Sequence, residues 1–135
     1  MVSRAADSLP TSLQPPPLGR EDFIALWTGT EMLIWGGRYM NTSPRQGARY
    51  DPATDTWSLM KLADGSSDYA SGPGETAVWT GTEMIIWGGS SRAGFTNRGA
   101  RYDPVHDAWR PTSVGPNAPT PRQNHAAVWT GTEMI

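Results

Sequence analysis

The feature that most constrains the fold of this chain is an internal repeat of about 50 residues. Residues 25–37 read ALWTGTEMLIWGG and residues 77–89 read AVWTGTEMIIWGG, so that eleven of thirteen positions are identical. A third copy of the first part, AVWTGTEMI, occupies residues 127–135, and GARYDP occurs at both 47–52 and 99–104. All seven tryptophans of the chain stand at repeat positions. Self-similarity at this period indicates an architecture built from one repeated supersecondary unit.

Each repeat predicts four short strands and no helix. In the first repeat, a β-prone run at 23–28 is followed by a Gly- and Thr-rich turn and by the apolar run 32–35, which suits a strand buried on both faces. We expect Gly36-Gly37 to end that strand, because a glycine pair permits positive φ and close backbone approach. The third strand is predicted at 47–50, ended by Asp-Pro, and the fourth begins near Trp57. The second repeat shows the same pattern, so the fold class predicted is all-β.

An apolar strand that ends in Gly-Gly, then a Tyr, then a Trp seven residues later resembles the signature of the kelch family, and it occurs twice here. The resemblance covers roughly residues 20–135 and implies a kelch-type β-propeller, of which the chain would supply about two and a half four-stranded blades of an incomplete ring. The expected organisation is a leading loop or linker at 1–19, blade 1 at 20–71, blade 2 at 72–121 and the start of a truncated blade 3 at 122–135. We therefore expect the remaining blades to come from a longer chain or from other copies.

The residues that recur are expected to be scaffold, with the aromatic side chains packed between blades and their polar tips satisfied. Recurring Arg49 and Arg101 are expected to form ion pairs or hydrogen bonds within their own blades, and the recurring Asp residues of the Asp-Pro turns to cap those turns rather than to bind calcium. The structural repeat positions are Trp27, Gly36, Gly37, Tyr50, Trp57, Trp79, Gly88, Gly89, Tyr102, Trp109 and Trp129.

Binding residues are expected where the repeat breaks. Loops 38–46 and 90–98 have equal length and different chemistry, and variable loops on a rigid scaffold commonly carry specificity. A second group lies at the entrances of the innermost strands, where alignment places Phe23, Glu75 and His125 at one position and Arg122 near them. Arg122 and His125 are candidates for an anionic or sugar ligand. The candidate binding residues are Arg38, Tyr39, Asn41, Arg45, Arg92, Phe95, Asn97, Arg98, Arg122 and His125.

No nucleophile–base pair, metal cluster or phosphate loop is found in the sequence, so no catalytic residues, metal or cofactor are predicted. Galactose oxidase resembles this fold, but its copper centre needs a Cys-linked Tyr, and the chain has no cysteine. The predicted function is a non-catalytic scaffold that binds an unknown protein or glycan through the face formed by the blade loops. The alternatives are part of a kelch-type propeller enzyme, such as a sialic acid mutarotase, and a structural fragment without activity of its own.

The charge and hydropathy of the sequence argue against two kinds of partner, nucleic acid and the interior of a membrane. The formal net charge is −2, and ten Arg with one Lys are scattered along the chain, so no basic stripe for nucleic acid is predicted. No apolar run approaches eighteen residues, so no membrane span is predicted. The compartment stays open, because a cysteine-free chain suits either redox environment. The uniform repeats resemble those of bacterial kelch proteins, which are often exported, and this resemblance favours a periplasmic or extracellular location.

Overall fold

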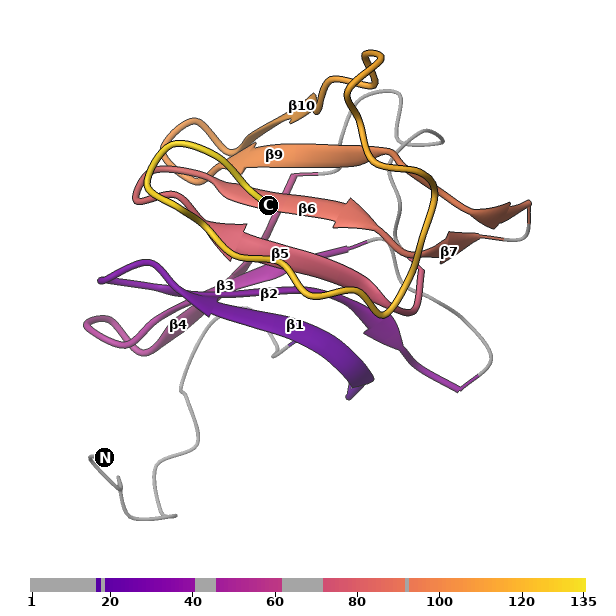
Figure 1. Cartoon of the computed structure of the whole chain (residues 1–135). Helices are drawn as coiled ribbons and strands as arrows, with labels where there is room; N and C mark the ends of the chain where they lie inside the picture. Colours follow the sequence, from indigo (N-terminus) through magenta and orange to yellow (C-terminus); the bar gives the residue numbers. More distant parts are fainter. Residues whose placement is uncertain (1–16, 18, 41–45, 62–71, 92) are drawn as a thin grey trace.

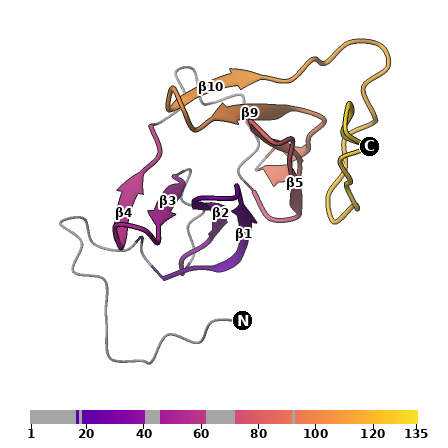
Figure 2. The same cartoon turned by 90° about the vertical axis from the view of Figure 1, so that its left-hand side faces the viewer.

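The computed structural model describes residues 17, 19–40, 46–61, 72–91 and 93–135. These residues form an all-β fold without helices, in which two four-stranded antiparallel sheets lie side by side (Figures 1 and 2). Accordingly, this part of the chain contains no helix long and apolar enough to cross a membrane.

The strands of the first sheet, in spatial order, are β1 (Glu21–Trp27), β2 (Met32–Arg38), β3 (Ala48–Asp51) and β4 (Thr56–Leu59). Those of the second sheet are β5 (Glu75–Trp79), β6 (Met84–Gly88), β9 (Gly99–Asp103) and β10 (Ala108–Pro111). Strands β7 (Ser90–Ser91) and β8 (Gly94–Phe95) form a separate small hairpin between β6 and β9. In both large sheets the spatial order follows the chain, so each is an antiparallel meander.

The repeat of the sequence is also a repeat of strand register. Met32 pairs with Tyr50 in the first sheet, as Met84 pairs with Tyr102 in the second. The Tyr of each pair is also opposite a Trp on the last strand, Trp57 or Trp109. Because side chains alternate between the two faces of a strand, the same register places equivalent side chains on the same face of each sheet.

The core lies between the two sheets. Trp109 of β10 packs across this boundary, with its ring centroid 4.4 Å from that of Trp35 on β2 and 4.8 Å from that of Tyr102. Its indole N–H donates to the carbonyl of Lys61 at 2.9 Å, which confirms the predicted packing with a satisfied polar tip. Each such large apolar side chain contributes about 2 kcal/mol when buried. The buried cluster consists of Leu33, Trp35, Met60, Met84, Ile86, Ala100 and Tyr102.

Two of the predictions for repeat positions are wrong. Trp27 is 56% exposed instead of packed in the core; it is the last residue of the edge strand β1. The pair Gly36-Gly37 does not end its strand: β2 continues to Arg38, which pairs with Glu21. The positive φ of both glycines (65° and 85°) bends the strand without breaking its pairing.

The glycine pairs do serve close approach, as predicted. A Cβ on Gly36 would collide with the carboxylate of Glu75 on β5. At the equivalent place in the second sheet, a Cβ on Gly88 would lie 2.6 Å from Cε1 of His125. In both cases a residue near the start of one repeat, Glu75 or His125, covers the first glycine of the Gly-Gly pair in the repeat before it.

The Asp-Pro turns are held by the capping that the sequence predicts. Tyr102 donates its hydroxyl proton to Oδ1 of Asp107 at 2.6 Å, and Tyr50 does the same to Asp55 at 2.5 Å. Both acceptor residues have positive φ, 48° at Asp107 and 55° at Asp55, a conformation that Asp tolerates better than most residues. Asp51 caps the start of its turn by accepting the N–H of the residue two positions on.

The recurring arginines form the predicted ion pairs within their own sheets. Nε and Nη2 of Arg49 donate to the two carboxylate oxygens of Glu31, both at 2.9 Å. Arg101 binds Glu83 in the same way, with 3.0 Å from Nε to Oε2. Arg49 makes one contact that its sequence pattern did not predict: Nη1 donates to the carbonyl of Pro104 at 2.8 Å and so ties the first sheet to the second.

Candidate functional site

The ends of β2 and β6 and the starts of β3 and β9 lie at one end of the two sheets, opposite to the Asp-Pro turns (Figure 1). We call this end the loop face. It carries five of the seven described residues that were predicted to bind a partner, namely Arg38, Tyr39, Phe95, Asn97 and Arg98. Predicted binding residues Asn41, Arg45 and Arg92 lie outside the described residues.

The β7–β8 hairpin replaces the plain polar loop that we expected at 90–98, so that expectation is wrong. Ser90 pairs with Phe95 around a tight turn, which Gly94 permits through its φ of 112°. The base of the hairpin is bound to the segment that follows β10, because the backbone N–H of Arg122 donates to the carbonyl of Thr96 at 3.2 Å. The hairpin stands out from the sheets (Figure 1). Phe95 lies at its base, opposite Ser90, and its side chain is 58% exposed.

The first sheet presents different chemistry at the loop face. Arg38 is exposed and binds Asp22 at 2.9 Å, with Glu21 at 3.6 Å, so acidic neighbours neutralise its charge. Tyr39 is half-buried beside it. Met40, which the sequence analysis did not single out, is 81% exposed. The two sheets therefore present unlike side chains from equivalent positions.

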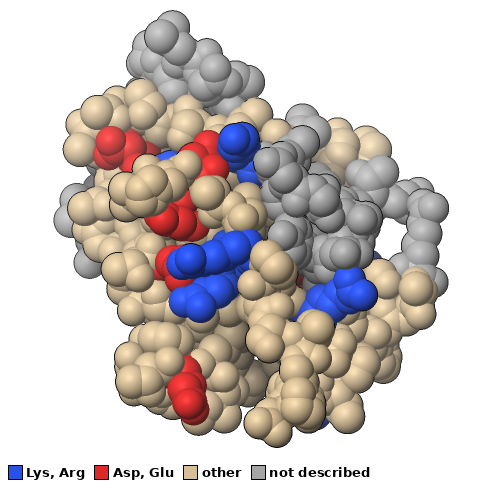
Figure 3. Space-filling model, turned by 90° about the horizontal axis from the view of Figure 1, so that it is seen from above, with Lys and Arg blue, Asp and Glu red and all other residues tan. Residues whose placement is uncertain are grey.

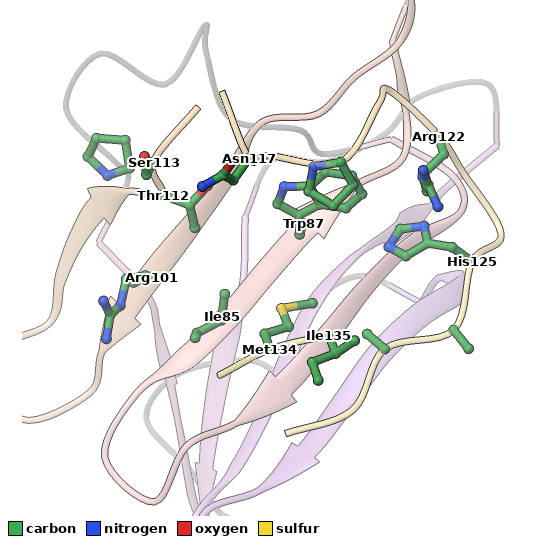
Figure 4. Close-up of a pocket in the computed structure, with 14 residues that line it drawn as sticks. Ile85, Trp87, Arg101, Thr112, Ser113, Asn117, Arg122, His125, Met134 and Ile135 are labelled. Atoms are coloured by element: carbon green, nitrogen blue, oxygen red, sulfur yellow. The ribbon is translucent and has the colours of Figure 1, made fainter. Parts of the chain in front are cut away.

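A pocket of about 530 Å³ opens on the other face of the second sheet, between β6, β9 and the segment that follows β10 (Figure 4). Ile85 and Trp87 of β6 form its floor, and Met134 and Pro119 supply further apolar walls. Its polar lining includes Arg101, Asn117, Arg122 and His125. The structure thus brings the predicted residues Arg122 and His125 together, and it adds Trp87 and Arg101, which the sequence had marked only as scaffold.

The imidazole of His125 is fixed at the edge of this pocket. Its Nε2 lies 2.7 Å from the hydroxyl of Thr76, and its ring meets that of Trp87 edge-on at 5.1 Å. Nδ1 is buried and has no hydrogen-bond partner among the described residues. Burial lowers the pKa of His125 below its ordinary value of 6.5, and the charge of Arg122 lowers it further. The side chain is therefore neutral at pH 7.

The pocket provides one guanidinium that is not occupied by an acid. Arg101 is bound to Glu83, which is buried and also binds Arg110. Arg122 instead donates to the carbonyl and hydroxyl of Thr120, at 3.1 and 3.0 Å. An apolar floor with one uncompensated cation at its rim suits an aromatic or apolar group that carries a carboxylate or carbonyl.

Viewed from the side of β10, basic side chains gather near the middle of the described surface, and most acidic side chains lie to one side of them (Figure 3). The part of the chain that the structure describes contains no group of three or more His, Cys, Asp or Glu able to hold a metal ion. No protein-family model matches the chain, and no curated protein is significantly similar to it.

Proposed function

We propose that the chain forms part of a kelch-type β-propeller and acts as a non-catalytic scaffold that binds a protein or a glycan through its loop face. The support for the propeller is the succession of two four-stranded meanders with equal strand order and register, packed side by side. This is the arrangement of consecutive blades.

The observation that carries the binding proposal is the β7–β8 hairpin. It adds a paired projection to one unit of a scaffold whose other parts repeat closely, and it carries an exposed Phe95 at its base. Exposed aromatic residues and arginines are the types that dominate binding energy at interfaces. Arg98 follows the hairpin three residues after Phe95 and is exposed, so it adds a cation to the same loop. The partner we expect offers an apolar face and a carboxylate, as acidic glycans and acidic peptides do.

The test is to probe glycan and peptide arrays with the chain and to compare three proteins: the parent, Phe95→Ala and Val105→Ala. Val105 is the matched control, because it is 83% exposed but lies on the Asp-Pro turn at the opposite end. We expect Phe95→Ala to weaken binding of the array hits about tenfold or more, and Val105→Ala to bind like the parent. Equal loss in both variants, or no loss in either, would refute recognition by the loop face.

A further inference from the structure

The pocket of the second sheet occupies positions that are covered on the first sheet. Six of its lining residues stand 52 positions after described residues of the first unit, three of which belong to the buried cluster between the sheets. The pocket residues are Ile85, Trp87, Arg101, Pro111, Thr112 and Ser113, and their counterparts are Leu33, Trp35, Arg49, Leu59, Met60 and Lys61. The side chain of Arg101 is 41% exposed, against 20% for Arg49, which shows how open the second position is.

On the first sheet, this position is filled by the turn between β9 and β10. Arg49 donates to the carbonyl of Pro104 at 2.8 Å. The backbone N–H of Lys61 donates to Oδ1 of Asp107 at 3.0 Å, and its carbonyl accepts the indole N–H of Trp109 at 2.9 Å. The first sheet therefore contacts a turn of the sequence YDPxxDxW in three ways: through the guanidinium of Arg49, the ring of Trp35 and the backbone N–H and carbonyl of Lys61.

The chain carries a second turn of the same kind, between β3 and β4. YDPATDTW at 50–57 matches YDPVHDAW at 102–109 in every residue that makes these contacts. Its shape also matches: the Tyr and Trp rings are 5.0 Å apart and tilted by 40° in one turn, and 4.8 Å apart and tilted by 41° in the other. The first turn is thus a ready copy of the element that fits the position.

We propose that the pocket of the second sheet binds the β3–β4 turn of a second copy of this chain. In this complex Trp57 of one copy packs on Trp87 of the other, and its indole N–H donates to the carbonyl of Ser113. Arg101 donates to the carbonyl of Pro52, and Asp55 accepts the N–H of Ser113. This contact between copies repeats the packing of one sheet on the next that already exists inside the chain. The proposal follows from the sequence repeat and does not depend on the proposed ligand binding.

Such a contact joins two different surfaces, so copies associate head to tail and either close into a ring or extend. Residues 122–135 lie along the pocket, where the only strand pairing is the bridge between Trp129 and Met134. His125 covers Gly88 there as Glu75 covers Gly36, which means that this segment takes the place of the first strand of a following unit. A fully docked second copy must therefore displace it, and removal of residues 122–135 strengthens the association.

The experiment is sedimentation of the whole chain, of 14.7 kDa, at concentrations up to about 500 µM, which detects weak interfaces. Two variants block one surface each: Trp57→Asp disrupts the turn, and Arg101→Glu disrupts the pocket. We expect the parent to gain mass with concentration and each variant alone to stay monomeric. An equimolar mixture of the two should form 1:1 dimers, because one good turn and one good pocket remain. Val105→Asp, on the exposed part of the other turn, should associate like the parent.

Circular dichroism first establishes that each variant is folded, and the Val105→Asp control reports the effect of an added charge, so the mixture tests association between folded chains. A parent that stays monomeric throughout would overturn the proposal. So would a mixture without dimers, or variants that associate as well as the parent. If the pocket instead takes a small molecule or an unrelated protein, the chain remains monomeric in this assay, and the proposal also fails.

Discussion

Glu75 offers the sharpest test of the packing between the two sheets. Its carboxyl group lies over Gly36 of β2, where any Cβ would collide with it. Its Oε2 is buried without a hydrogen-bond partner among the described residues. Burial raises the pKa of Glu75 to about 8 from its ordinary value of 4.5, and the nearby Trp35 indole offsets this only in part. At pH 7 the folded chain therefore keeps this group protonated, whereas the unfolded chain ionises it.

The free-energy cost follows from that difference. A pKa raised from 4.5 to about 8 corresponds to about 5 kcal/mol of stability lost at high pH. The stability from this group is fully present below pH 4.5, falls as the pH rises, and is fully lost above pH 8. At pH 7 the loss is about 3 kcal/mol. Glu75→Gln keeps the shape of the side chain and cannot ionise, so it should recover most of this loss at pH 7.

The assay is urea unfolding of the parent and of Glu75→Gln at pH 4, 7 and 9. We expect nearly equal stability at pH 4 and a growing advantage of the variant at pH 7 and 9. Glu21→Gln is the control, because Glu21 is 71% exposed and touches Arg38 only at 3.6 Å; it should change stability by less than about 0.5 kcal/mol at each pH. If the difference between Glu75→Gln and the parent is the same at pH 4 and pH 9, the carboxyl group is not buried as described.

Three further predictions concern single contacts. Tyr102→Phe removes the buried hydroxyl that binds Asp107 at 2.6 Å, and it should lower the free energy of unfolding by about 1 to 2 kcal/mol in urea titration. Gly36→Ala should destabilise the chain more than that, since its Cβ meets a neighbouring carboxylate, whereas Gly19→Ala, with no atom within 4 Å, should be neutral in thermal melting. The pKa of His125 in an NMR titration should lie below 6.5, and stability from this group should fall as the pH drops through that pKa; a pKa at or above 6.5 would contradict its burial.

The repeat pattern predicted the contacts that form within one sheet or one turn. Arg49 and Glu31 recur at fixed positions, and their ion pair forms within one sheet, where strand register alone brings them together. The turn between Tyr102 and Asp107 was predictable for the same reason, because its residues are close in sequence and its geometry depends on their own conformations.

The rest of the structure depends on contacts that the repeat does not encode. The β7–β8 hairpin forms from residues whose counterparts in the first unit differ in sequence, and its pairing follows from one turn at Gly94 rather than from a hydrophobic pattern. The exposure of Trp27 could not be read from its recurrence, because burial depends on what packs beside a strand and not on the strand itself. The contact of His125 with Thr76 joins residues 49 positions apart, one of them outside any strand.

The hydrogen bonds between the two sheets end mainly on main-chain oxygens. Arg49 binds the carbonyl of Pro104 and Trp109 binds that of Lys61, whereas the N–H of Lys61 donates to the carboxylate of Asp107. A carbonyl is present whatever the side chain, so these junctions place few demands on the identity of the neighbouring residue. Units of this type can therefore be duplicated, exchanged or reordered within a gene while the joints between them stay intact. Selection is then free to alter the exposed end of each unit separately.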